Sequence, residues 1–121
     1  PKGVDVYFDN VGGAMTDAVM MNVNPFARIS ICGAISAYNV TTPDVGPRLF
    51  TLLLIRQATA TGFLVPQFAA KWGQGVAEMA KWINEGKIKY REDVMNGLEN
   101  TPKAFIRMLN GENKGKQLVK V

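Results

Sequence analysis

Histidine is absent from this sequence, and Cys32 is its only cysteine. Without histidine, a Ser-His-Asp triad, a Cys-His dyad and most catalytic zinc sites are excluded. A single cysteine can form neither an internal disulfide nor a multi-cysteine metal site. Any chemistry must therefore depend on tyrosine, lysine, serine, carboxylates, backbone amides or a bound cofactor, and we expect no bound metal.

Long hydrophobic runs are missing as well. The longest apolar stretch covers residues 49–55, whereas a membrane-spanning helix needs about 20 apolar residues. We therefore expect a soluble protein with no membrane partner. With 121 residues, of which 47% are hydrophobic and 20% charged, the chain has the size and composition of one compact globular domain, which excludes disorder and collagen-like structure.

The net charge of +4 comes entirely from the region after Gly86, because residues 1–86 carry six basic and six acidic side chains. The later basic side chains are spaced among apolar residues and lack the aromatic neighbours typical of nucleic-acid surfaces. No nucleic-acid partner is therefore predicted. Two interpretations remain open, namely a solvated basic face and a site for a small anionic ligand near the C-terminus.

The first part of the chain predicts a βαβ unit with parallel strands. Residues 4–9 alternate between apolar and polar side chains, which predicts a strand, and a Gly-Gly pair then allows a tight turn. A helix follows, and we expect it to end at Asn24-Pro25, because the residue before proline avoids the helical region. A second strand is expected over residues 28–32. The apolar stripe of the helix consists of Met15, Val19 and Val23.

Residues 33–47 predict a long irregular loop, and such loops in compact domains are usually functional or mobile. We expect a helix over residues 48–56 and a third strand over residues 58–65, which Pro66 stops. In a parallel sheet the carboxyl ends of all strands lie on one edge, where ligands bind. The segments that follow the three strands are therefore expected to lie together.

The second part of the chain predicts a different organisation. Apolar residues at helical spacing lead up to Gly86, which is placed as a helix C-cap glycine. Thr101-Pro102 predicts another helix, with the threonine hydroxyl as its cap and the proline in its first turn. Strand-like segments at residues 88–94 and 117–121 have no evident neighbour in this chain, so we expect them to be unpaired.

Composition alone leaves two interpretations of the glycine-rich strand ends, because such segments form either plain turns or ligand sites. The sequence has neither a GxGxxG pattern nor a P-loop, so pattern alone does not predict a phosphate-binding turn. Six sequence motifs, in their order along the chain, are more specific than composition. They are VDVYFDNVGG (4–13), CGAISAYN (32–39), GFLV (62–65), WINEGKIKY (82–90), GLENTPKAF (97–105) and GENKGKQLV (111–119).

These motifs resemble the zinc-independent medium-chain dehydrogenase/reductases, in the branch of the prostaglandin reductases and the bacterial NADP-dependent alkenal and enone reductases. The resemblance implies an NADPH-dependent reductase that transfers hydride to a carbon–carbon double bond conjugated to the carbonyl of a small enone or alkenal. It also implies an α/β fold, in which residues 1–70 form the second half of a Rossmann-type doubly wound parallel sheet. Residues 71–121 would return to a GroES-like catalytic domain. A cytoplasmic homodimer is implied as well.

The resemblance also places individual residues at the cofactor. Tyr38 is the implied catalytic residue, whose phenol would donate to a ribose hydroxyl or to the enone oxygen; a packed ring with a solvated hydroxyl is the alternative. Asn113 would reach the cofactor, and a plain turn role is its alternative. Cys32 is interpreted as a buried packing residue rather than a nucleophile, because no histidine can activate it. The implied cofactor-binding residues are Asn10, Cys32, Gly33, Ala34, Ile35, Ser36, Ala37, Tyr38, Phe63, Leu64, Val65 and Asn113.

The full chains of this family are much longer than 121 residues. They carry a GroES-like domain, a glycine-rich turn for the pyrophosphate and a basic residue for the 2′-phosphate, none of which we identify in this sequence. We therefore expect the chain to be the C-terminal portion of such a reductase and to be inactive by itself. The alternative from another class is a non-catalytic, stand-alone binding domain on a Rossmann-like scaffold.

Overall fold

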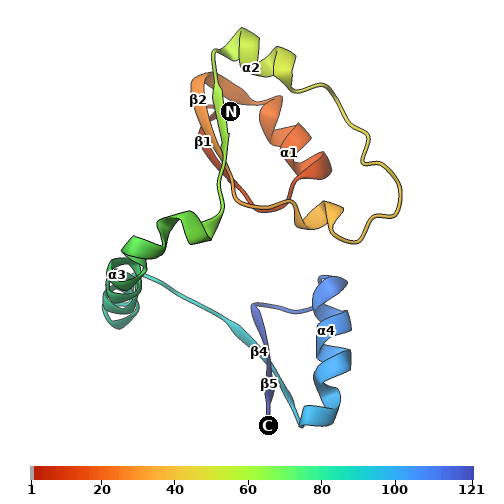
Figure 1. Cartoon of the computed structure of the whole chain (residues 1–121), viewed down its shortest axis with the longest axis vertical. Coiled ribbons are helices and arrows are strands. Elements are labelled where there is room, and N and C mark those ends of the chain that lie inside the picture. Colours follow the sequence, from red (N-terminus) through yellow and green to blue (C-terminus); the bar gives the residue numbers. More distant parts are fainter. Residues whose placement is uncertain (1) are drawn as a thin grey trace. The chain divides into compact units, whose positions relative to one another are not determined.

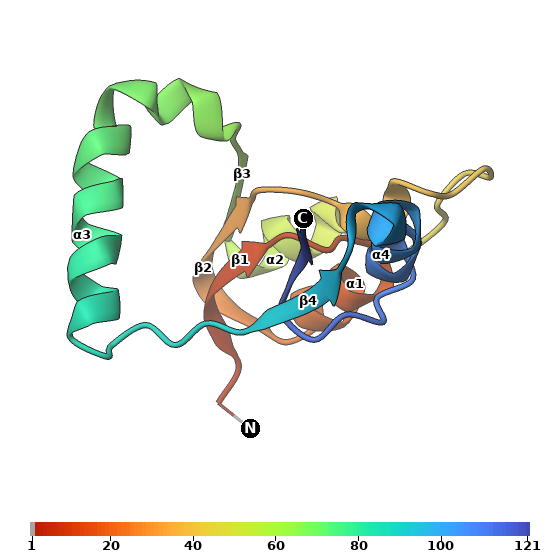
Figure 2. The same ribbon diagram turned by 90° about the horizontal axis from the view of Figure 1, so that it is seen from below.

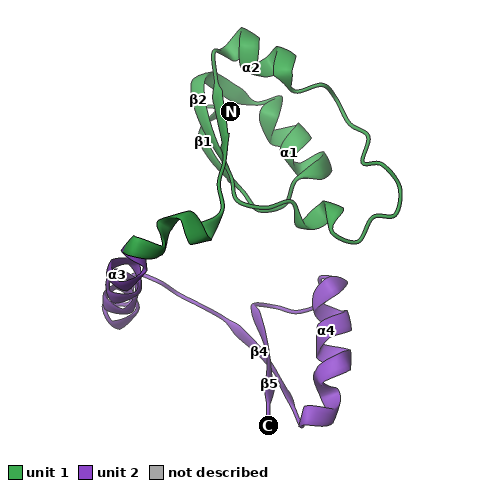
Figure 3. Ribbon diagram, in the orientation of Figure 1, with its two compact units in different colours: residues 1–70 green, residues 71–121 purple. Residues whose placement is uncertain are grey.

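The computed structural model describes residues 2–121 (Figures 1 and 2). It contains two compact units, Pro1–Ala70 and Lys71–Val121 (Figure 3). This division falls where the sequence analysis places a domain boundary, whereas the assignment of each unit to a domain of a reductase stays a prediction. Both units are built from helices and parallel strands, which confirms the α/β class.

The first unit is built on a three-stranded parallel sheet with the order β1-β2-β3 (Figure 2). Strand β1 (Val4–Asp9) pairs with β2 (Val23–Ile31), and β2 pairs with β3 (Thr59–Gly62). The register places Tyr7 of β1 opposite Ile29 of β2. Because the three strands are parallel, their carboxyl ends share one edge of the sheet, as the sequence predicts.

Helices α1 (Gly13–Met20) and α2 (Phe50–Arg56) pack against one face of this sheet. Met20 of α1 and Ile29 of β2 are 2% and 3% exposed, and Leu53 of α2 packs against them. Burial of an aliphatic side chain contributes about 1.5–3 kcal/mol, so this core stabilises the sheet and the position of its carboxyl edge. The other residues of the core are Val4, Tyr7, Val23, Ala27, Leu49, Leu52 and Ala58.

The opposite face of the sheet is open. Val6 and Phe8, which form the apolar row of β1, are 61% and 56% exposed. The covered face of β1 instead carries Tyr7 and the buried Asp9. Since a doubly wound sheet has helices on both faces, the described residues of this unit supply only one of the two helix layers.

The expected end of the first helix is wrong. Helix α1 ends at Met20, and Val23, which is only 1% exposed, belongs to β2 together with Asn24 and Pro25. The residue before a proline prefers an extended backbone, and a strand satisfies this preference as well as a loop does. Val23 therefore packs into the core from a strand and not from a helix.

The third strand is shorter than expected. Strand β3 ends at Gly62 and does not continue to Pro66, because the chain turns into a 3-10 helix over Val65–Lys71. Residues 33–47 form an irregular loop, as predicted, apart from a short 3-10 turn at Ile35–Ala37. The segment after β3 consequently leaves the sheet directly beside the end of β2.

The second unit contains helix α3 (Trp72–Asn84), strand β4 (Glu92–Asn96), helix α4 (Thr101–Leu109) and strand β5 (Lys116–Lys120). The expectation that its strands are unpaired is wrong, because β4 and β5 pair in parallel along their whole length. Helix α4 forms the crossover that parallel neighbours require. The sequence did not predict this pairing, because backbone hydrogen bonds form it. The charged side chains of both strands gave no indication of a neighbouring strand.

The helix ends of the second unit were predicted in part. Gly86 has φ +68°, and the N–H of Lys87 donates to the Trp82 carbonyl at 2.8 Å, which confirms the C-cap after α3. Pro102 lies in the first turn of α4, as predicted. Thr101 does not cap this helix, however, because its hydroxyl donates to a carbonyl of the preceding turn at 2.7 Å.

Candidate functional site

Three segments meet at the carboxyl ends of the parallel strands. They are residues 10–13 after β1, residues 32–38 after β2 and residues 63–65 after β3. The N–H of Phe63 donates to the Ile31 carbonyl at 3.1 Å, so the third segment begins in register with the end of β2. The structure therefore brings together the strand ends that the sequence singles out.

Backbone hydrogen bonds fasten the loop at 32–38 to the turn at 10–13. The N–H groups of Cys32 and Gly33 both donate to the Asp9 carbonyl, at 2.8 and 3.1 Å. The N–H of Ile35 donates to the Asn10 carbonyl at 3.2 Å, and the N–H of Ser36 donates to the Val11 carbonyl at 3.0 Å. The two segments thus form one continuous backbone surface.

The close approach of these segments explains the glycine pair. Gly12 has φ +73°, and a Cβ at this position would lie 3.1 Å from the Cβ of Ala34. Gly13 has φ +56°, and its Cβ would lie 2.9 Å from the Ser36 Oγ. Both the left-handed backbone and the lack of space favour glycine. These residues therefore do more than turn the chain, because they let the turn touch the loop.

A buried carboxylate holds the turn in place. Asp9 is 2% exposed, and no other charged side chain of the described residues is as deeply buried. Its Oδ1 accepts hydrogen bonds from the N–H groups of Val11 and Gly12 at 2.9 and 3.0 Å, and from the Tyr7 hydroxyl at 3.0 Å. Its Oδ2 accepts from the Thr16 hydroxyl.

Sequence reasoning missed Asp9, because an aspartate at the end of an alternating strand is usually a solvated polar residue. The available signal was its position three residues before Gly12, the first glycine of a pair that opens a helix. A carboxylate at such a place can accept hydrogen bonds from backbone N–H groups and interacts favourably with the helix dipole.

The hydrogen bonds keep Asp9 ionised. Burial alone would raise the pKa of its carboxyl, but the hydrogen bonds from Thr16, Gly12, Val11 and Tyr7 outweigh burial and hold the pKa below its usual value. Burial raises the pKa of Tyr7, and the neighbouring carboxylate adds to this effect. Since the pKa of Asp9 is lowered on folding, its contribution to stability is present above about pH 4 and is lost as the pH falls through the folded value.

An open cavity of about 710 Å³ lies along the same edge. It is lined mostly by apolar residues from the end of β2, from the loop that follows and from the segment after β3. Cys32 is half-buried in its wall and is therefore not the fully buried packing residue that we expected. The predicted cofactor-binding residues that line the cavity are Cys32, Gly33, Ala34, Tyr38, Phe63 and Leu64.

The hydroxyl of Tyr38 lies back against the loop. It accepts a hydrogen bond from the Ala34 N–H at 3.4 Å, and it lies 3.1 Å from the position that a Cβ on Gly33 would take. Glycine at position 33 therefore leaves room for the phenol. Because the oxygen accepts from the backbone, its own proton is free for donation to a ligand. The side chain is 68% exposed, so a ligand can reach it.

The other predicted site residues do not line this cavity. Ser36 fastens the loop, because its hydroxyl donates to the Val11 carbonyl at 2.6 Å. Ile35 and Val65 are 59% and 52% exposed. Contact of these residues with a cofactor stays a prediction. The residues outside the cavity lining are Asn10, Ile35, Ser36, Ala37, Val65 and Asn113.

Asn113 belongs to the second unit and takes part in a turn. Its side-chain amide donates to the Gly115 carbonyl at 2.6 Å, which is the turn role that the sequence left open. The N–H of the next residue, Lys114, donates to the Asp93 carboxylate at 3.0 Å, and Arg107 pairs with the same carboxylate at 3.4 Å. The backbone hydrogen bond from Lys114, with help from Arg107, lowers the pKa of Asp93. Asp93 thus holds the segment that presents Asn113.

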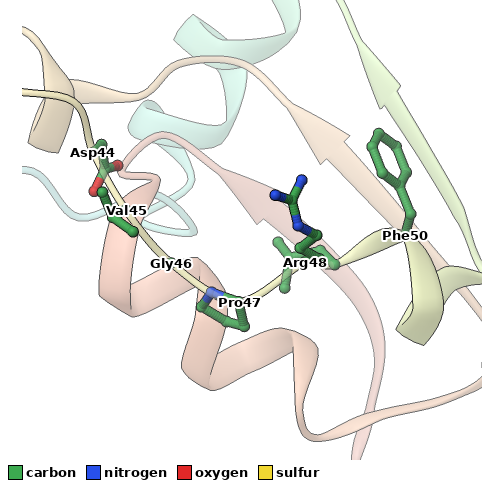
Figure 4. Close-up of a pocket in the computed structure, with 7 residues that line it drawn as sticks. Asp44, Val45, Gly46, Pro47, Arg48 and Phe50 are labelled. Carbon is green, nitrogen blue, oxygen red and sulfur yellow. The ribbon is translucent and has the colours of Figure 1, made fainter.

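A second hollow, of about 410 Å³, follows residues 44–50. Figure 4 shows its lining, which runs from the last residues of the irregular loop to the first residue of α2. None of the predicted cofactor-binding residues contributes to it. We therefore interpret it as a bend of the loop and place no function there.

Residues 2–121 offer neither a cluster of metal ligands nor a helix that could span a membrane. No group of three or more His, Cys, Asp or Glu side chains is arranged to hold a metal ion. Among the same residues, no helix has the length and apolar character needed to cross a bilayer. The candidate site consists of the turn at 10–13 and the loop at 32–38, which backbone hydrogen bonds join, together with the end of β3 and the cavity beside it.

Comparison with known proteins finds relatives along nearly the whole chain. The zinc-binding dehydrogenase family matches residues 1–119. The chain is 41% identical to the NADPH-dependent curcumin reductase of Escherichia coli (strain K12), over 100% of this chain and 36% of that relative. It is 43% identical to prostaglandin reductase 1 of Sus scrofa, over 99% of this chain and 37% of that relative.

Among solved structures, CurA from Vibrio vulnificus in complex with NADPH has a TM-score of 0.86 and 42% identity, covering 98% of this chain and 37% of that one. The predicted resemblance to the prostaglandin reductase branch is confirmed by these relatives. The chain spans about a third of the length of the curated relatives that it matches.

Proposed function

The chain belongs to the zinc-binding dehydrogenase family, and from this premise we propose that it forms part of an NADPH-dependent reductase of enones or alkenals. In this proposal the three strand ends hold the nicotinamide side of NADPH. The observation that carries it is the 42% identity, over 98% of this chain, with CurA, whose solved structure contains NADPH. The curcumin reductase and the prostaglandin reductase add two relatives that are reductases by name.

The cavity at the strand edge supports the binding of a flat ring, because its wall is mostly apolar. Gly12 and Gly33 contribute indirectly. A Cβ at either position would lie 3.1 Å from Ala34 or from the Tyr38 hydroxyl, so glycine at both positions lets the turn, the loop and the phenol pack closely. Phe63 and Leu64 supply an apolar wall to the cavity. In the proposal, the main-chain groups of Phe63, Leu64 and Val65 hold the carboxamide of the nicotinamide.

Bound NADPH would supply the hydride that is delivered to the β-carbon of the substrate. Tyr38 would act as a hydrogen-bond donor, because its hydroxyl proton is free. It would donate to a ribose hydroxyl of the cofactor or to the carbonyl oxygen of the substrate. Negative charge develops on that oxygen, so a fixed donor stabilises the transition state more than the ground state.

The remaining parts of the proposal concern the whole protein. Residues 1–70 would form the C-terminal half of the cofactor domain, and residues 71–121 would form the connecting helix and the return segment of the GroES-like catalytic domain. Asn113 would reach the cofactor from this second segment. We also propose a cytoplasmic homodimer, as the family resemblance implies.

The proposed function is tested by replacing Tyr38 in the full-length protein that carries this chain. We expect the wild type to consume NADPH with an enone as substrate. Tyr38→Phe should lower kcat/KM by about 10-fold to 100-fold, because it removes one donor to the developing charge. The decrease in nicotinamide absorbance gives the rates.

Tyr90→Phe is the matched control, since Tyr90 is 69% exposed and does not belong to the strand edge. This variant should keep the wild-type rate. Equal rates for Tyr38→Phe and the wild type would contradict the proposed role of Tyr38. A full-length protein that binds NADPH but reduces none of a set of enones and alkenals would instead favour a non-catalytic binding domain.

A second prediction concerns the glycine turn. Gly12→Ala should raise the Kd for NADPH by about 10-fold, because the added Cβ combines a positive φ with a 3.1 Å approach to Ala34. Gly75→Ala is the control, since a Cβ at Gly75 in α3 meets nothing within 4 Å. Fluorescence titration of both full-length variants measures the Kd, and equal values would show that the turn does not shape the cofactor site.

A further inference from the structure

Asp9 makes two sets of hydrogen bonds that lead to different parts of the candidate site. Its carboxylate holds the N–H groups of Val11 and Gly12 in the turn after β1. Its main-chain carbonyl accepts from Cys32 and Gly33 at the start of the loop after β2. A movement of this one residue would therefore displace both of the segments that we propose to bind the cofactor.

The hydrogen bonds that the Asp9 side chain accepts depend on its negative charge. All four of its partners are donors, namely two backbone N–H groups and the hydroxyls of Tyr7 and Thr16. A carboxylate can accept from all of them, because both of its oxygens are acceptors only. The hydrogen bonds are also charge-assisted, which makes them stronger than bonds between neutral groups.

An asparagine of the same shape could not reproduce this arrangement. In one orientation its NH₂ group would face Tyr7 and the two backbone N–H groups, which places donors against donors. In the other orientation the NH₂ group would face Thr16, whose hydroxyl would have to rotate and become an acceptor. In both cases the negative charge near the start of α1 is lost.

We propose that Asp9 is a positioning residue for the cofactor. Its carboxylate sets the position of the turn at 10–13 against the loop at 32–38, and loss of its charge weakens NADPH binding more than it slows hydride transfer. This inference rests on the proposed function. Asp9 itself is 2% exposed and acts through the backbone of its neighbours, so it is not expected to touch NADPH.

The test compares Asp9→Asn with Asp5→Asn in the full-length protein. Asp5 lies on the same strand, but it is exposed, and within residues 2–121 its carboxylate accepts a hydrogen bond only from the Asn24 side chain. Both variants lose one negative charge from β1, so they differ chiefly in the network. Thr16→Val is a milder second variant, because it removes one donor and leaves the carboxylate in place.

We expect Asp9→Asn to raise the KM for NADPH by about 10-fold while kcat changes by less than about twofold. Thr16→Val should shift the KM in the same direction by a smaller factor, and Asp5→Asn should match the wild type. A residue needed only for folding would give the opposite pattern. It would lower kcat through loss of active protein and leave the KM of the folded fraction unchanged, which would overturn the proposal.

Amide hydrogen exchange of the protein without NADPH separates this inference from the proposed function. In Asp9→Asn, exchange should accelerate at residues 10–13 and 32–38 and remain at the wild-type rate in α2. Unchanged exchange in both segments would overturn the positioning role, as would equal acceleration throughout the first unit. If the wild type neither binds NADPH nor reduces an enone, the proposed function fails, whereas the exchange comparison still decides what Asp9 holds in place.

Discussion

The 121-residue chain by itself is expected to show no steady oxidation of NADPH in the presence of an enone. Its strand ends supply one side of the proposed site, and the chain spans about a third of the length of its curated relatives. The sequence contains no GxGxxG turn for the pyrophosphate. Without contacts to that part of NADPH, most of the binding energy that orients the nicotinamide is missing.

The measurement is the absorbance of the reduced nicotinamide, with the pure chain at high concentration and the full-length protein as the positive control. The full-length protein should turn over, and the rate of the isolated chain should not exceed that of a sample without protein. Steady turnover by the isolated chain, proportional to its concentration, would contradict our account of the missing contacts.

The isolated chain is also expected to associate with itself. All residues of β3 are exposed, and one face of β1 leaves Val6 and Phe8 open to solvent. Helix α3 has an apolar stripe that includes Val76, which is 61% exposed, and Met79, which is 49% exposed. Soluble monomers rarely expose contiguous apolar surface or free strand edges of this kind.

Light scattering of the isolated chain at increasing concentration tests this prediction. We expect a molar mass well above the monomer value of 13.2 kDa. Val76→Lys should lower the association, because it places a charge in the apolar stripe, whereas Ala77→Lys on the neighbouring side of α3 serves as the matched control. A monodisperse monomer of the wild type at high concentration would contradict this prediction, because the exposed apolar faces would then not bind one another.

Local sequence signals predicted most of the first unit. Residues 4–9 and 28–32 were recognised as parallel strands because a helix of suitable length lies between them, and the strand ends were expected at one edge. The end of α1 was missed, since the backbone preference of Asn24 before Pro25 fits a strand and a loop equally well. Val23 fits both a helical stripe and a buried strand, and only the tertiary core decides between them.

The second unit was predicted less completely. The C-cap at Gly86 follows from the position of one glycine after a helical pattern, and such local rules need no knowledge of the fold. The pairing of β4 with β5 depends on a backbone crossover through α4. Strand pairing of this kind leaves little trace in side chains, especially where the strands are rich in charge.

For the candidate site, the segments followed from the rule that ligands bind at the carboxyl ends of parallel strands, and the structure confirms that these ends lie on one edge of the sheet. The roles of individual residues came from the resemblance to known reductases and stay predictions. The position of Asp9 before the glycine pair indicated a carboxylate that accepts from backbone N–H groups, but its complete network could not be predicted, because only the folded chain brings four donors to one carboxylate. The glycine pair beside it had two interpretations until the close approach of the loop was seen.

The most direct test of the central claim is amide hydrogen exchange of the full-length protein with and without NADPH. We predict that NADPH slows exchange at residues 10–13, 32–38 and 63–65, and at the segment around Asn113. Exchange in α3 should change much less. NADPH-induced protection that spares all of these segments, at a concentration that saturates the protein, would contradict the claim that this chain holds the nicotinamide.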